Sequence, residues 1–90
     1  MTDEEAQRVW LVERSYGHDE DLVTLVFAST DGRLQLKKQL SHNMLYNRTI
    51  TAAREEPRSN LDVVRDEETR QRYADEASRM ANRHEPDEAV

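Results

Sequence analysis

The residues best suited to chemistry in this chain are its three histidines and its many carboxylates. His18, His42 and His84 stand far apart, whereas the zinc motif of metalloproteases needs two histidines four residues apart on one helix face. His18 with Asp19 and Asp21 could hold a cation weakly, but this loop lacks the length and ligand order of a calcium site. We therefore predict a solvated turn here and no bound metal.

Nucleophilic and phosphate-binding sites are not indicated either. The chain has no cysteine, so disulfides, thiolate metal sites and cysteine nucleophiles are excluded. Gly17 and Gly32 are the only glycines, too few for a phosphate-cradling loop or a dinucleotide fingerprint. The serines fall in expected strands, caps and loops rather than beside a base. The sequence predicts neither an enzyme nor a cofactor-binding protein.

Charge is distributed unevenly along the chain. The net charge is -6, from 13 basic and 19 acidic residues, and it divides into -6 over residues 1–31, +5 over 32–54 and -5 over 55–90. The middle segment contains no acid, and its bases are Arg33, Lys37, Lys38, Arg48 and Arg54. These bases could contact a phosphate backbone or an acidic protein. Alternatively, they neutralise acidic segments of the same chain.

The preference for arginine over lysine and the excess of acidic residues indicate a protein from a high-salt cell. Eleven of the bases are Arg and two are Lys, a bias typical of salt-loving archaea, although an acidic protein from a GC-rich genome would look similar. The chain opens on acidic residues rather than a signal peptide, and its longest apolar run, residues 25–28, is too short to span a membrane. We expect a cytoplasmic protein.

Alternating apolar residues and one turn signal predict the sheet. Residues 8–16 and 22–30 are typical of strands, and residues 33–40 alternate Leu with polar side chains. Asp31-Gly32 between the last two is a strong hairpin signal. The sequence therefore predicts a three-stranded antiparallel meander.

The second half of the chain predicts one helix and shorter elements. Ser41 can cap a helical turn over residues 44–46, residues 49–53 could form a fourth strand, and residues 61–64 could add to an edge. Asp66 is expected to cap a helix over about 67–84. One face of that helix carries Tyr73, Ala77, Met80, Ala81 and His84.

The expected fold class is α+β, with a small sheet of three or four mainly antiparallel strands packed by one C-terminal amphipathic helix. Ninety residues suit one domain, which we place at 8–84. Residues 1–7 and 85–90 are predicted to be flexible acidic tails.

Three segments of the chain together resemble segments of known proteins. They are residues 9–14 (Val-Trp-Leu-Val-Glu-Arg), 22–26 (Leu-Val-Thr-Leu-Val) and 72–81 (Arg-Tyr-Ala-Asp-Glu-Ala-Ser-Arg-Met-Ala). This pattern resembles small acidic haloarchaeal proteins of unknown function. The resemblance spans most of the folding unit and implies a single domain from such a source. It contains no functional motif and implies no activity.

Apolar residues on both faces of the first two strands predict self-association. One helix about 10 Å wide covers roughly two strands on one face, so either residues 41–47 or a second copy must cover the other. Trp10, Val12 and Tyr16 are expected to share a face and to form the candidate interface of a homodimer.

Two functions remain open at this point. The first is a non-catalytic protein-interaction or regulatory module, self-associating or bound to a protein partner. The second is a nucleic-acid-associated module that binds through the basic segment 33–54. The sequence identifies no small-molecule substrate, no cofactor and no membrane attachment.

Overall fold

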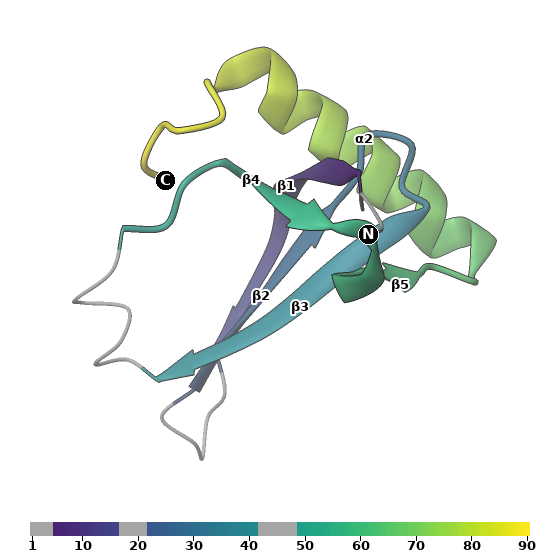
Figure 1. Cartoon of the computed structure of the whole chain (residues 1–90), viewed down its shortest axis with the longest axis horizontal. Coiled ribbons are helices and arrows are strands. Elements are labelled where there is room, and N and C mark those ends of the chain that lie inside the picture. Colours follow the sequence, from purple (N-terminus) through teal and green to yellow (C-terminus); the bar gives the residue numbers. More distant parts are fainter. Residues whose placement is uncertain (1–4, 17–21, 42–48) are drawn as a thin grey trace.

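The computed structural model describes residues 5–16, 22–41 and 49–90. Within them, the chain forms an antiparallel sheet in the strand order β4-β1-β2-β3-β5, with helix α2 (Glu67–Arg83) on one face (Figure 1). The predicted α+β class with a meander and a C-terminal helix is confirmed. The remaining elements are β1 (Ala6–Tyr16), β2 (Leu22–Ala28), β3 (Leu34–Ser41), β4 (Ala53–Pro57), the 3₁₀ turn η1 (Arg58–Asn60) and β5 (Asp62–Val63).

The fourth strand lies later in the chain than predicted. We expected it at residues 49–53, but β4 begins at Ala53 and includes the charged residues Arg54, Glu55 and Glu56. Pairing with β1 decides its position, because Ala53 lies opposite Trp10 and Pro57 lies opposite Ala6. The helical turn predicted near residues 44–46 and the turn at 17–21 lie outside the described residues.

The Asp31-Gly32 hairpin between β2 and β3 rests directly on the helix. Gly32 has φ 73°, in the left-handed region that favours glycine. A Cβ at this position would overlap the carbonyl oxygen of Arg70 and lie 2.9 Å from the backbone nitrogen of Ala74. Ser29 donates a hydrogen bond to Asp31 (2.6 Å), which lowers the pKa of that carboxyl group. Glycine is therefore required both by the turn and by its contact with α2.

The link between β4 and β5 forces the sheet to curl. These strands lie at opposite edges, and four strand spacings of about 4.8 Å would separate them by roughly 19 Å in a flat sheet. Five residue steps join Pro57 to Asp62 and span at most about 17 Å when fully extended. The 3₁₀ turn η1 shortens this reach further, since it rises only about 2.0 Å per residue. The edges must therefore approach each other, and Figure 1 shows β4 and η1 crossing in front of β2 and β3.

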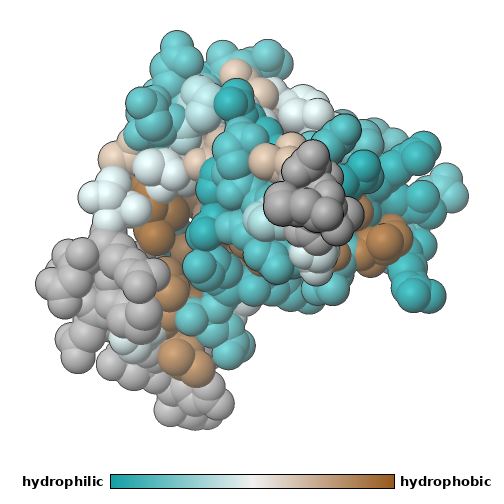
Figure 2. Space-filling view, in the orientation of Figure 1, coloured by the Kyte–Doolittle hydropathy of each residue, from teal (hydrophilic) through white to brown (hydrophobic). Residues whose placement is uncertain are grey.

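Curling gives the domain two cores on the two faces of the sheet. The inner core, inside the curl, consists of Val9, Leu11, Val23, Leu25, Phe27, Leu40 and Leu61. The helix-side core, between the sheet and α2, consists of Trp10, Val26, Ala28, Ala52, Ala53, Val64, Tyr73 and Ala77. In the orientation of Figure 1, the surface over β4 is mostly hydrophilic, and a hydrophobic strip runs down the left of the view beside it (Figure 2). The predicted two-sided burial of β2 is confirmed.

A β-bulge at Val12 changes the faces of the first strand. Leu11 pairs with Phe27 and Glu13 pairs with Val26, so Val12 is the additional residue. Beyond the bulge, Tyr16 lies opposite Val23 and therefore shares the inner-core face. The prediction that Tyr16 shares a face with Trp10 and Val12 was wrong, because strict alternation fails at the inserted residue.

The last residues of the chain pair with the segment before β4. The backbone N–H groups of Ala52 and Ala53 donate to the carbonyl oxygens of Glu88 (2.8 Å) and Pro86 (3.0 Å), and Val90 donates to Ile50 (2.9 Å). The expectation that residues 85–90 form a flexible tail is therefore corrected. The other predicted tail, residues 1–7, is also corrected in part, because Ala6 and Gln7 belong to β1 and pair with Pro57 and Glu56 of β4. Residues 1–4 lie outside the described residues.

Helix α2 begins as predicted, at its cap. The Asp66 carboxylate accepts hydrogen bonds from the backbone N–H of Thr69 (2.9 Å) and from its hydroxyl group (2.7 Å), and these bonds lower the Asp66 pKa. Tyr73 and Ala77 are its buried residues. No helix in the described part of the chain is long and apolar enough to cross a membrane.

Replacing Gly32 by Ala should destabilise the domain by about 2 kcal/mol or more, because it adds left-handed strain and a clash with the α2 backbone. The free energy of unfolding from urea titration measures this effect. Thr30→Ala, an exposed change in the same turn, is the matched control and should stay within about 0.5 kcal/mol of the parent. Equal losses in both variants would contradict the close contact between turn and helix.

Candidate interaction edge

The two lysines of the chain lie on opposite faces of β3. Lys37 pairs with Val26 of the helix-side core, and Lys38 pairs with Leu25 of the inner core. Adjacent residues of a strand point to opposite faces of the sheet. The basic segment therefore does not present both lysines on one surface, although both flank the same strand edge.

The outer edge of β3 carries backbone groups that no described strand pairs. The Leu34 carbonyl accepts a hydrogen bond from Ser29 on the β2 side (3.0 Å), whereas the Arg33 carbonyl accepts one from Val64 on the opposite side (2.8 Å). This alternation directs the backbone of Lys37 and Gln39 away from β2. β5 pairs only with Leu34 and Gln35. We call residues 36–40 with these outward backbone groups the open edge.

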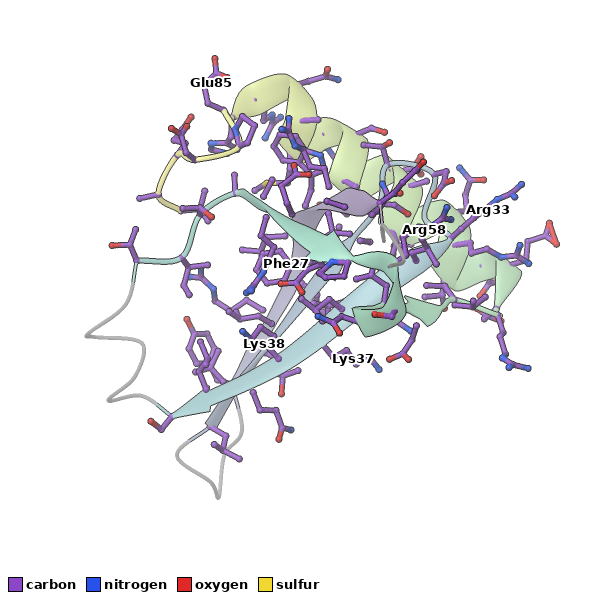
Figure 3. The ribbon with its side chains drawn as sticks, viewed as in Figure 1. Phe27, Arg33, Lys37, Lys38, Arg58 and Glu85 are labelled. Carbon is purple, nitrogen blue, oxygen red and sulfur yellow. The ribbon has the colours of Figure 1, made fainter. Side chains whose placement is uncertain are left out.

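Bases surround the open edge. Arg33 precedes β3 at the end beside α2, and Figure 3 shows Lys37 and Lys38 farther along the strand. Arg58 begins η1, and Arg65 follows Val64, which is bonded to Arg33. Asp31 and Asp62 are the acids on these same connecting segments. Among the described residues, none of these five bases forms an ion pair, whereas the pairs present are Arg8–Glu55, Arg54–Glu56, Arg72–Glu13, Arg79–Glu76 and His84–Glu88.

Arg54, another base of the segment, interacts with groups of the same chain. Its Nη2 lies 2.5 Å from an Oε of Glu56, and its guanidinium carbon lies 5.8 Å from the centre of the Phe27 ring. Glu56 is 8% exposed and accepts a hydrogen bond from Asn60 in η1 (3.1 Å). The Asn60 hydrogen bond and the charges of Arg54 and Lys38 lower the Glu56 pKa despite its burial. Arg54 therefore neutralises an internal carboxylate, and Arg48 lies outside the described residues.

The candidate interface residues do not form one exposed surface. Trp10 is 6% exposed and lies beneath α2 with Ala77, and Val12 packs beside it. Tyr16 is 59% exposed but lies on the other face, beyond the bulge. Every inner-core residue is at most 9% exposed within the single chain. The apolar face that motivated the homodimer therefore has a buried core within the single chain, with Leu34, Leu36 and Ile50 partly buried around it.

An open hollow of about 440 Å³ lies beside the bulge. Its apolar wall includes Leu11, Val12 and Met80. The charged groups around it already interact within the chain: Glu13 pairs with Arg72, Glu76 with Arg79 and His84 with Glu88, and Arg14 donates to the Val90 carbonyl. No group of three or more potential metal ligands occurs in the described part of the chain. The open edge thus offers more unused bonding capacity than the hollow.

Comparison with protein families matches residues 2–90 to DUF7967, a family of unknown function. The chain belongs to DUF7967. No curated protein and no solved structure matches it.

Sequence reasoning missed three parts of the edge in this DUF7967 chain. It named Arg33, Lys37 and Lys38, but not the backbone of Gln39 or the bases Arg58 and Arg65. The signal was present in part, because residues 61–64 were predicted to add to an edge. The missing information was that β5 is only two residues long and leaves most of β3 unpaired.

The Glu56 carboxylate should make the stability of the DUF7967 domain depend on pH. Its folded pKa is below the ordinary 4.5, so ionisation favours folding above that value. This contribution is lost as the pH falls through the folded pKa. Glu56→Gln should reduce the free energy of unfolding by about 2 kcal/mol at pH 7 and by less at pH 3. Denaturant titrations at both pH values measure the difference.

Glu55→Gln is the matched control for that experiment. Glu55 pairs with Arg8 on the surface, and both side chains are about half exposed. Such pairs contribute little to stability, so this variant should remain near the parent at both pH values. If Glu56→Gln behaved like Glu55→Gln, the internal role of Glu56 would be wrong.

Proposed function

We propose that the chain is a non-catalytic protein-interaction module that accepts a strand of a partner protein along the open edge of β3. The observation that carries this proposal is the outward backbone of Lys37 and Gln39 beyond the end of β5. Each of these residues offers an N–H donor and a C=O acceptor to an extended chain. Strand addition to such an edge is a common form of peptide recognition.

The two outer sides of the sheet are both partly covered, and the smaller coverage of β3 supports this proposal. On one side, β4 pairs with β1 from Ala6 to Trp10, and the backbone just before β4 is itself bonded to the C-terminal segment. On the other side, β5 covers only two residues of β3. Exposed edges of this kind are generally covered or protected by charge. The open edge has charge at Lys37 and Lys38, which restricts what can pair there.

The nucleic-acid alternative finds less support in the placement of the bases. A strand or loop that follows a phosphate backbone needs its bases on one accessible surface. Lys38 and Arg54 lie on the inner face near Glu56, whereas Lys37 lies on the helix side. The protein-partner function is therefore the one that the geometry favours.

A photoreactive residue at position 39 should crosslink to a partner protein in native lysate, and the crosslink should disappear when Lys37→Pro is added. Proline removes an outward N–H, and edge strands tolerate it at such positions. The same photoreactive residue at Asn82, on an exposed part of α2, should give products that Lys37→Pro does not change. Mass spectrometry identifies the crosslinked species.

The outcome of that experiment separates the two functions. Strand docking is supported if Lys37→Pro removes the protein crosslinks formed from position 39 and leaves those formed from position 82. Nuclease-sensitive products at position 39 would favour the nucleic-acid alternative. The absence of any product that depends on the edge would contradict the proposed function. A thermal melt of Lys37→Pro confirms that the variant remains folded.

We further propose that the module works in a salt-rich cytoplasm, because the chain combines a net charge of -6 with a strong preference for Arg over Lys. Its melting temperature should rise from dilute buffer to molar KCl, since salt screens repulsion among the surplus carboxylates. A rise from screening levels off below about 0.5 M, whereas salting-out continues to increase with concentration. Equal melting temperatures throughout would contradict this proposal.

A further inference from the structure

We infer that the strand received by the open edge is an acidic amphipathic strand of another protein, with two adjacent carboxylates flanked by apolar residues. This inference rests on the proposed function and adds the chemistry of the partner. It follows from the side chains that β3 presents on its two faces. The partner must complement both faces at once, because each residue of an added strand lies beside a residue of β3.

The two faces of the open edge differ. The helix-side face carries Lys37 between Gln35 and Gln39, and the inner face carries Lys38 between Leu36 and Leu40. An added antiparallel strand runs along β3 from Leu40 to Leu36. It therefore lies beside an apolar residue, a polar residue, two lysines and a second apolar residue, in that order. Its best complement is apolar, polar, acidic, acidic, apolar.

Charge selects this partner over a second copy of the chain. In an antiparallel pair of two β3 strands, a register centred on Lys37 or on Lys38 places that lysine directly opposite its own equivalent. Like charges in this position destabilise a sheet, and opposite charges stabilise it. The surrounding bases Arg33, Arg58 and Arg65 strengthen the preference for an acidic strand. The lysines thus protect the edge from self-pairing and make it selective.

Two capped peptides that contain the core Val-Thr-Glu-Glu-Val or Val-Thr-Lys-Lys-Val test this inference. Amide NMR of the full chain at low salt should show that the Glu-Glu peptide shifts the Lys37 and Gln39 signals and slows their hydrogen exchange. Leu36 and Leu40 amides, which point toward β2, should change little in exchange. The Lys-Lys peptide should bind at least about tenfold more weakly, since two cross-strand pairs change sign.

Single charge-reversing substitutions test whether Lys37 causes the preference for the acidic peptide. Lys37→Glu should weaken binding of the Glu-Glu peptide several-fold and strengthen binding of the Lys-Lys peptide. Arg83→Glu makes the same charge change at an exposed position near the end of α2 and should leave both affinities nearly unchanged. An equal effect of the two substitutions would mean that general charge, rather than the edge, selects the peptide, and would overturn the inference.

The remaining outcomes separate the inference of an acidic partner strand from the proposed function of strand docking at the open edge. Equal binding of both peptides at the Lys37 and Gln39 amides would overturn the acidic preference and leave strand docking intact. Binding of the Glu-Glu peptide without changes at these amides would overturn the inference by placing the contact elsewhere. Neither peptide binding, while position 39 still crosslinked to a protein in lysate, would show that the acidic amphipathic pattern of the partner strand is wrong. The proposal that a partner strand docks at the open edge would remain.

Discussion

The short connection from β4 to β5 is the constraint on which the rest of the structure depends. A link this short between opposite edges rules out a flat sheet, and it makes the curl a geometric necessity rather than a consequence of packing. The curl encloses the inner core and brings Leu61 into it. It also leaves the convex face for α2. The connection is held at its start by Glu56, which binds Arg54 of β4 and Asn60 of η1.

The same constraint determines which strands have partners. Only two residues remain for β5 before the chain turns toward the helix cap at Asp66. β3 is eight residues long, so most of its outer edge extends past its neighbour. A more complete β5 would need a longer connection and would cover Lys37 and Gln39. The open edge is thus a direct result of how little chain separates the end of β4 from the beginning of α2.

Local sequence signals predicted the parts of the fold that local chemistry controls. Asp31-Gly32 placed the hairpin, apolar runs placed the first two strands, alternation placed the third, and Asp66 placed the start of the helix. The parts that depend on distant pairing were missed. The bulge at Val12 leaves no sign in the pattern, because residues 9–12 are all apolar and an inserted residue does not interrupt such a run. Glu-rich β4 and the segment near Glu88 have little intrinsic strand preference, and their extended form comes from pairing with β1 and with residues 50–53.

The candidate site was predicted in the same uneven way. Counting charges identified Lys37 and Lys38 as unusual, but a count does not show that they lie on opposite faces of an unpaired strand. It also grouped them with Arg54, which serves an internal carboxylate. Their concentration has a further consequence. Since the chain contains only these two lysines, every side-chain primary amine is placed on β3. Acylation of lysine would therefore change the charge of this strand and of no other element, making β3 itself neutral while the arginines around it kept their charge.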